Sequence, residues 1–234
     1  MEIRDLTLPL LISKLWQKGL SFFYYLFFVM IKKPWYKFSY SWNGNMFCCK
    51  GVLRRCHVMM SGGNNSLIIA KTAYLNNVRI DISGHNNSLI ISEGVSFSEG
   101  GFIRIQDNDN KIIIGRNTKI INAFFSSADL NTTIEIGEDC LFSNDIIIRS
   151  SDSHSLLNVD GKRINKGADV YIGNHVWICN GVRIMKGSKI GNNCVVGSNT
   201  IVSGQESHDN TLIVGSPARI IKENIDWSYE RKYD

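Results

Sequence analysis

Residues 172–202 read IGNHVWICNGVRIMKGSKIGNNCVVGSNTIV. An aliphatic residue returns at every sixth position of this stretch, and a small or β-branched residue stands four places after it. This period matches neither a helical turn nor the plain alternation of a strand. It is typical of a parallel β-helix, in which each hexad supplies one short strand and a turn, and the inward side chains stack into one continuous core. The predicted core positions are Ile172, Val176, Ile178, Val182, Ile184, Ser188, Ile190, Cys194, Val196, Thr200 and Val202.

A longer repeat precedes the hexads. Four segments follow one another at steps of 22 or 23 residues: GGNNSLIIA (62–70), GHNNSLIIS (84–92), DNDNKIIIG (107–115) and DLNTTIEIG (129–137). Each has a polar, Asn-rich turn and then alternating apolar residues, and Asn suits such corners because it tolerates left-handed backbone. We interpret each step as a coil of three hexads with extra residues at one corner. The sequence therefore predicts an all-β core, a parallel β-helix over residues 61–222.

The six-residue rule breaks at residues 149–169, RSSDSHSLLNVDGKRINKGAD. Polar residues stand where the period expects aliphatic ones, at His154, Asp160 and Lys166. The chain must leave the β-helix here and return at Val170, and long excursions from a regular scaffold commonly carry function. After residue 202 the pattern fades, and we expect a short C-terminal helix over the open end of the coils, with a tail at 223–234.

Residues 1–60 form a separate N-terminal segment. It holds nine Lys or Arg and two Asp or Glu, so it carries +7 in a chain whose net charge is +5. Leu20–Ile31 is an apolar run that precedes two lysines and is too short to span a bilayer comfortably. Two interpretations stay open: a helix that packs on the β-helix or on another subunit, or an interfacial helix through which residues 1–33 contact a membrane. The aromatic stretch after it is expected to cap the first coil.

Composition narrows the classes of partner. The basic charge belongs to the N-terminal segment, so no nucleic-acid groove is predicted in the β-helix. The six cysteines lack the paired spacing of a zinc site and the density of a secreted scaffold. We therefore expect no metal and a reducing, cytoplasmic location, at the inner face of the membrane if the N-terminal segment is an anchor.

The order of these parts resembles a known family. The SDSH loop, the IGNHVWI hexad, the hexads after it and the GSPARII segment are similar to the left-handed β-helix acyltransferases with hexapeptide repeats. The long coils resemble more narrowly the bacterial members that O-acetylate capsular or lipopolysaccharide sugars. The resemblance implies a left-handed coil, a homotrimer, acetyl-CoA as co-substrate, and a sugar or polysaccharide acceptor.

The resemblance also assigns roles. It implies that His154 is the general base on the acceptor hydroxyl and that Trp177 lines the thioester end of the coenzyme. A base whose pKa lies near the operating pH suits a poorly nucleophilic hydroxyl, and histidine is that base. His175, in contrast, stands at an outward position of a hexad. Coenzyme contacts are implied at Asn180, Ser198, Ser203, Gly204, Arg219 and Lys222, and the candidate acceptor contacts are Asn122 and Asp152.

Two positions depart from the family pattern. Cys179 replaces a smaller Gly or Ala, and Ser216-Pro217-Ala218-Arg219 replaces Asn-Pro-Ala-Lys, where Arg can serve a phosphate as well as Lys. Other functions remain open: N-acetylation of an amino sugar nucleotide, acetylation of serine or a xenobiotic, or a non-enzymatic scaffold. A zinc enzyme of the carbonic anhydrase type needs three converging histidines, and the hexads supply only His175.

Overall fold

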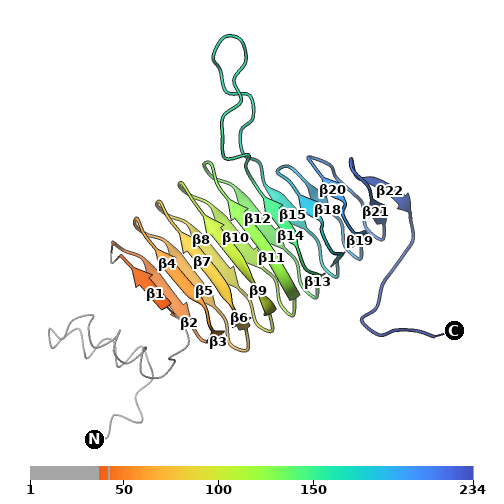
Figure 1. Ribbon diagram of the computed structural model, residues 1–234, viewed down its shortest axis with the longest axis horizontal. Coiled ribbons are helices and arrows are strands. Elements are labelled where there is room, and N and C mark those ends of the chain that lie inside the picture. Colours follow the sequence, from red (N-terminus) through yellow and green to blue (C-terminus); the bar gives the residue numbers. More distant parts are fainter. Residues whose placement is uncertain (1–36, 42, 234) are drawn as a thin grey trace, which may run out of the picture. The chain divides into compact units, whose positions relative to one another are not determined.

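The computed structural model describes residues 37–41 and 43–233, and every regular element in that part of the chain is a β-strand. All strands but the last pair in parallel along three faces of a prism, as the stacked arrows in Figure 1 show. Each coil visits face 1, face 2 and face 3 in turn, which confirms the predicted parallel β-helix. Among the described residues, no helix is long and apolar enough to cross a membrane.

The strands divide among the faces as follows. Face 1 contains β3 (Val52–Arg54), β6 (Tyr74–Asn76), the starts of β9 (Ser96–Ile105) and β11 (Lys119–Ser127), β13 (Leu141–Phe142), β16 (Trp177–Ile178), β19 (Val195–Val196) and β21 (Leu212–Val214). Face 2 contains β1 (Lys37–Tyr40), β4 (His57–Met60), β7 (Val78–Ile82), the ends of β9 and β11, β14 (Ile146–Arg149), β17 (Arg183–Ile184) and β20 (Ile201–Val202). Face 3 contains β2 (Met46–Cys49), β5 (Ser66–Ile69), β8 (Ser88–Ile91), β10 (Lys111–Ile114), β12 (Thr133–Ile136), β15 (Val170–Ile172) and β18 (Lys189–Ile190).

The hexads build the core as their period predicts. All eleven predicted inward positions are at most 4% exposed. Each buried Val or Ile side chain contributes about 1.5–3 kcal/mol relative to exposure. The two inward hydroxyls are also paired, since Ser188 Oγ donates to Val202 O at 3.2 Å and Thr200 Oγ accepts from Gly215 N at 3.2 Å. Polar hexad positions therefore fit the core without a buried polar group left unsatisfied.

An asparagine ladder lines the corner between face 2 and face 3. Asn65, Asn87 and Asn110 are buried, and the Oδ1 atom of each accepts the backbone N–H of the next rung at 2.7–2.9 Å. Left-handed residues such as Asn64 and Asn86 precede the ladder positions. The extra residues of the long coils lie between the face 2 and face 3 strands, so the predicted single enlarged corner is confirmed.

The β-helix begins earlier than we expected. β1 to β4 lie within 37–60 and pair in register with later coils, for example Lys37 with His57. The boundary predicted at residue 61 is therefore wrong for the described part of the N-terminal segment. The corner between β1 and β2, Asn43-Gly44-Asn45, already belongs to the asparagine ladder, because Asn45 Oδ1 accepts the backbone N–H of Asn65 at 2.8 Å. The apolar run at 20–31 and its proposed membrane contact lie outside the described residues.

The predicted C-terminal helix is also wrong. Arg219–Lys222 forms β22, which pairs antiparallel with β21, and the tail then runs in an extended path back along the corner between faces 3 and 1. Asn210 and Ile225 exchange backbone and side-chain hydrogen bonds at 3.0 Å, and the Tyr229 hydroxyl reaches Asp139 O at 3.2 Å. Alternate aromatic residues, Trp227 and Tyr229, dock on the coils because an extended chain turns both toward the same side.

The cysteines have a packing role. All six are free thiols. Burial raises the pKa of the Cys140 thiol to about 11, so it stays protonated near neutral pH. Since the thiolate is the nucleophilic form, Cys140 fills an inward hexad position and offers no reactive sulfur.

Candidate active site

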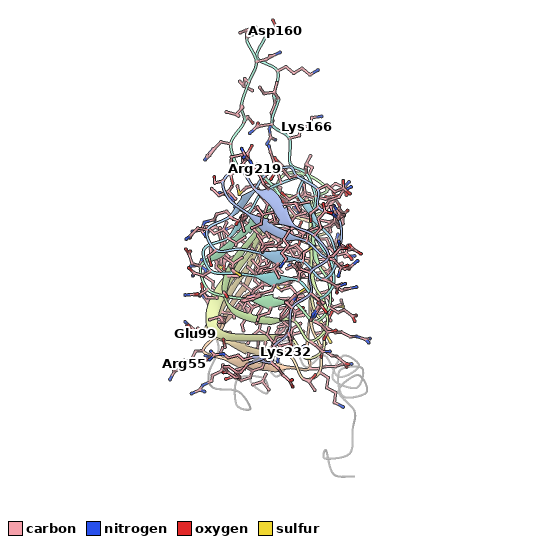
Figure 2. All side chains as sticks on the ribbon, turned by 90° about the vertical axis from the view of Figure 1, so that its right-hand side faces the viewer. Arg55, Glu99, Asp160, Lys166, Arg219 and Lys232 are labelled. Carbon is pink, nitrogen blue, oxygen red and sulfur yellow. The ribbon has the colours of Figure 1, made fainter. Side chains whose placement is uncertain are left out.

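The loop between β14 and β15 is a long hairpin that leaves the coil at the corner between faces 2 and 3. Figure 1 shows it projecting from the body of the molecule, and Figure 2 places Asp160 at its far tip and Lys166 nearer the coils. Leu157 and Arg163 form an antiparallel bridge, and Asn158 closes the tip by accepting the backbone N–H of Lys162 at 2.8 Å. The break in the hexads therefore gives an ordered hairpin.

Asn165 joins the two arms of the hairpin at its base. Its Nδ2 atom donates to His154 O and to Asp152 Oδ2, both at 2.8 Å, while its Oδ1 atom accepts the backbone N–H of Leu156 at 2.7 Å. Lys186, from the corner before β18, donates to Asp152 Oδ2 at 2.6 Å. This hydrogen bond holds the pKa of the Asp152 carboxyl below its usual value. The backbone on both sides of His154 is thus fixed to the coil.

A second ion pair anchors the descending arm. Both guanidinium nitrogens NH1 and NH2 of Arg163 donate to Asp129, at 2.7 and 2.8 Å, in the bidentate geometry favoured by Arg and carboxylate. Ser151 Oγ, from the ascending arm, donates to the same carboxylate at 2.8 Å. Hydrogen bonding to Arg163 lowers the pKa of the Asp129 carboxyl. One acidic residue on the coil therefore holds both arms.

The His154 side chain is exposed at this fixed position. Its carbonyl is held by Asn165, whereas its imidazole makes no hydrogen bond within residues 37–41 and 43–233. A histidine with an ordered backbone and an unengaged ring can accept a proton from a substrate that docks against it. The ring of His154 is therefore open to a molecule that docks beside the loop.

Trp177 lies on the other side of the same coil. It is on face 1 as part of β16, whereas His154 leaves from the opposite corner, between faces 2 and 3, so one chain does not bring the two together. The Trp177 Nε1 atom is buried and has no partner among the described residues. Trp227 from the tail lies beside it, with ring centroids 5.9 Å apart.

His175 differs from the free surface residue that its outward position suggests. It is half-buried and stacks on Trp227 at 4.3 Å, and its backbone carbonyl accepts the indole N–H of Trp227 at 2.7 Å. Its Nε2 atom also lies 3.4 Å from Asp226 Oδ1. His175 therefore holds the tail against face 1.

The six predicted coenzyme residues fall into three places. Asn180 and Ser198 share the corner between faces 1 and 2, where Asn180 Nδ2 donates to Asn144 Oδ1 at 2.8 Å. Ser203 and Gly204 are exposed on the corner between faces 2 and 3, the corner from which the loop with His154 projects. The remaining two, Arg219 and Lys222, are exposed on β22.

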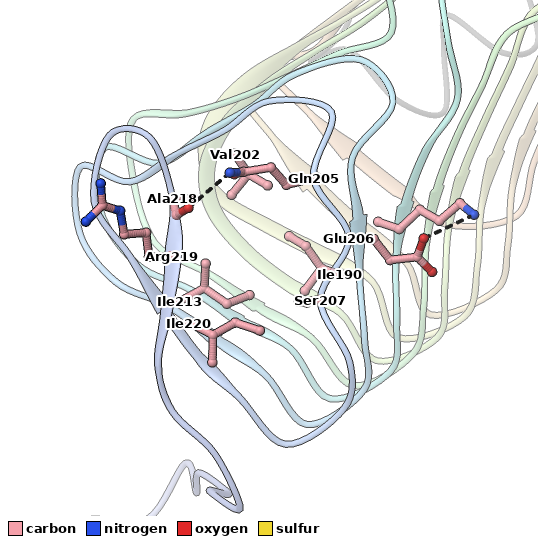
Figure 3. A pocket seen from close by; sticks show the side chains of 10 residues that line it. Ile190, Val202, Gln205, Glu206, Ser207, Ile213, Ala218, Arg219 and Ile220 are labelled. Carbon is pink, nitrogen blue, oxygen red and sulfur yellow. Dashed lines mark hydrogen bonds and ion pairs between the residues drawn. The ribbon is translucent and has the colours of Figure 1, made fainter.

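Small residues line the corner between the loop and the C-terminal end of the coils. A side chain added at Gly187 would meet only Gly204 Cα at 3.5 Å and Ala168 Cβ at 3.8 Å, so this corner is flat. Beyond it the coil ends in a hollow of about 350 Å³ that Arg219 borders. In Figure 3, isoleucines line the inner side of this hollow and the Arg219 guanidinium points away from them. A flat corner that ends at a cation can accept an extended anionic molecule.

Of the candidate acceptor contacts, Asp152 is committed to the loop, as described above. Asn122 borders a separate hollow of about 360 Å³ on face 2, together with Phe102 and Phe124. No sequence pattern marks Asn165, because its contacts depend on the fold of the loop. Lys186 was also missed, although a cation directly before the corner glycine of a hexad is a visible feature. Within the described residues, no group of three His, Cys, Asp or Glu side chains is placed to hold a metal ion.

Comparison with known proteins agrees with this architecture. Residues 169–204 match a family model described as bacterial transferase hexapeptide (six repeats). A polysialic acid O-acetyltransferase from Neisseria meningitidis is 38% identical over 167 residues, which cover 71% of this chain and 76% of that protein. The chain belongs to the hexapeptide-repeat acyltransferases. A second polysialic acid O-acetyltransferase, from Escherichia coli O1:K1, is 40% identical over 120 residues, 51% of this chain; the chain spans only 38% of that relative's length.

Two solved structures of such acyltransferases share the fold over most of the chain. The polySia-specific acetyltransferase NeuO has a TM-score of 0.76 at 30% identity, covering 86% of this chain and 93% of that one. The polysialic acid O-acetyltransferase OatWY has a TM-score of 0.71 at 31% identity, covering 85% and 93%.

Proposed function

We propose that the protein transfers an acetyl group from acetyl-CoA to a sugar hydroxyl of a bacterial capsular polysaccharide, with His154 as the general base. The observation that supports this proposal most directly is the exposed imidazole of His154 on a backbone held by Asn165 and Asp152. The imidazole takes the hydroxyl proton while the oxygen attacks the thioester carbonyl. The tetrahedral intermediate then collapses to the sugar ester, and the thiolate of coenzyme A leaves and recovers the proton from the imidazolium.

Coenzyme A fits the flat corner below the loop. Its extended pantetheine arm would run past Ser203 and Gly204, and its phosphates would lie near Arg219 and Lys222, both exposed cations at the end of the coil. Asn180 and Ser198 lie on another corner, and Trp177 lies on face 1. These three can therefore reach the same coenzyme molecule only from a second copy of the chain.

A homotrimer supplies that second copy. The loop exposes large apolar side chains, a feature that marks a contact surface. Leu156, Leu157 and Ile164 are each more than half exposed, and Val159 at the tip is fully exposed. We propose that the loop of one subunit packs against face 1 of its neighbour and completes the site there with Trp177. Because acetyl-CoA is made in the cytoplasm, we place the reaction in that compartment.

The relatives suggest the acceptor. Two of them are described as acting on polysialic acid, an anionic capsular polymer, and we propose an acceptor of this class here. In this assignment Asn122 contacts the polymer, whereas Asp152 is a positioning residue that acts through Asn165.

The test is acetyl transfer to a panel of acceptors. Purified protein with acetyl-CoA should release thiol in the presence of polysialic acid and label the polymer with an acetyl group that hydroxylamine removes, as an ester requires. An amino sugar nucleotide, serine and a neutral polymer should give no product. An amide product on the amino sugar, or turnover of serine alone, would replace the proposal with one of the other transferase functions.

A further inference from the structure

Face 2 presents two columns of outward side chains. Most of these side chains do not contact the loop. The register of β7, β9, β11 and β14 aligns every second residue of these strands. One column contains Arg79, Phe102, Phe124 and Ile147, and the column beside it contains Asp81, Arg104, Ser126 and Arg149. We call Phe102, Arg104, Phe124 and Arg149 the face 2 track.

The aromatic rings and cations of this track are held rigidly against one another. Phe102 and Phe124 stack with centroids 5.2 Å apart and an angle of 24°. The guanidinium of Arg104 lies over both rings, 4.6 Å from Phe102 and 5.9 Å from Phe124, and Arg79 lies 5.1 Å from Phe102. Such contacts fix the cation without neutralising its charge.

Arg104 forms no ion pair among the described residues, although Asp81 stands opposite it in the register of β7 and β9. Asp81 is instead paired with Arg79 at 2.6 Å. Arg149 contacts Ser153 Oγ at 2.7 Å through its NH2 nitrogen, and its Nε atom is buried without a partner there. Two preorganised cations on one flat face favour an anionic ligand.

A hollow beside the rings adds polar groups. Its volume is about 360 Å³, within the range of about 300–1,000 Å³ common for small-molecule sites. Besides the two phenylalanines it is lined by Asn77 and Asn122, whose amides can donate to and accept from sugar hydroxyls. Aromatic faces next to amides and cations suit a sugar chain that bears carboxylates.

We propose that the face 2 track binds the anionic polysaccharide at sugar units distant from the one that is acetylated. The carboxylates would lie against Arg104 and Arg149, and the sugar rings against Phe102 and Phe124. The track leads directly to the catalytic loop, because Arg149 is hydrogen-bonded to Ser153, the residue before His154. This inference rests on the proposed function and adds the surface that would select a long acceptor over a short one.

Face 3 gives the contrast that favours face 2 for this ligand. Its aligned outward column contains Ile68, Ile90 and Ile113 on β5, β8 and β10. An aliphatic column of this kind suits contact with protein, whereas the arginines of face 2 suit a polyanion. The same coil of the chain thus offers a matched control: Lys111, on β10, is a cation on face 3.

Binding is measured first, without acetyl-CoA, so that it does not depend on catalysis. Full-length protein is titrated with fluorescently labelled polysialic acid at low and physiological salt, with neutral dextran as competitor. Arg104→Gln and Phe124→Ala should each weaken binding about tenfold, which corresponds to about 1.4 kcal/mol. Lys111→Gln should stay within twofold, and dextran should not compete. Unchanged affinity in both track variants, or competition by dextran, would overturn the proposal.

Kinetics then separate the track from the active site. With long polysialic acid the two track variants should raise KM about tenfold and leave kcat and the KM of acetyl-CoA unchanged, and with a sialic acid trimer they should match the native enzyme. Equal losses of kcat/KM with the long polymer and with the trimer would contradict the proposal. A change in assembly mass by light scattering also contradicts it, since face 2 would then be a contact between copies. If native protein acetylates neither acceptor, the proposed function fails, and the binding titration still decides whether the track exists.

Discussion

Asn165→Ala tests how the loop presents the base. The substitution removes three hydrogen bonds of 2.7–2.8 Å, which join Asn165 to Asp152, His154 and Leu156. At a net contribution of about 0.5–1.5 kcal/mol each, their loss costs about 3 kcal/mol of local order. If that whole cost falls on the catalytic arrangement of the loop, its population drops roughly 100-fold, and kcat drops with it. The core is untouched, so the thermal midpoint should change little.

The assay compares kcat at saturating acetyl-CoA and acceptor with hydrogen exchange across residues 150–169. Exchange in the loop should rise while the KM of acetyl-CoA stays near native, because the coenzyme lies along the corner below. The control is Asn158→Ala, which loses hydrogen bonds to Asp160 and Lys162 at the tip only and should retain kcat within a few-fold. If Asn165→Ala also keeps kcat within about threefold while its loop exchanges faster, the order of the loop does not position the base, and this reasoning is refuted.

Three further outcomes test the fold and its anchors. Asn87→Ala should cost about 2–4 kcal/mol in denaturant unfolding, because the buried backbone N–H of Asn110 and two part-buried carbonyls lose a hydrogen-bond partner; Asn86→Gly is the exposed control and should cost under about 1 kcal/mol. Trp227→Ala should speed hydrogen exchange at 225–229, and unchanged exchange would show that its stacking does not hold the tail. Because the pKa of Asp129 is lowered, its pairing with Arg163 should stabilise the loop above about pH 4 and be lost as the pH falls through the folded pKa; protease cleavage of the loop that does not rise in acid would contradict this.

The periodic parts of this protein could be predicted residue by residue. A hexad fixes which side chain points inward, so even Ser188 and Thr200 were assigned correctly to the core. The repeats ending in SLII and KIII likewise predicted the strands of face 3 and their register. In a coil each residue contacts its equivalent one turn away, and sequence spacing therefore reports spatial neighbours directly.

The non-periodic parts could not be predicted in the same way. The tail was expected to be helical, but docking of Trp227 and Tyr229 on distant coils decides its extended form, and no local pattern reveals those partners. The break in the hexads marks the loop as a special segment. It does not reveal which residues anchor the loop to the coil. Asn165 and Lys186 converge on Asp152 only because the hairpin folds back on its own corner.

The central claim is that His154 removes a proton from the acceptor hydroxyl. The most direct test is kcat of His154→Ala beside His85→Ala, an exposed histidine in a turn of an earlier coil. We predict that His154→Ala lowers kcat by about 10²–10⁴-fold with acetyl-CoA binding and assembly mass unchanged. His85→Ala should be near native, and native kcat should fall in acid because a protonated ring cannot accept the hydroxyl proton. A His154→Ala enzyme that acetylates the polymer within a few-fold of the native rate would contradict the account.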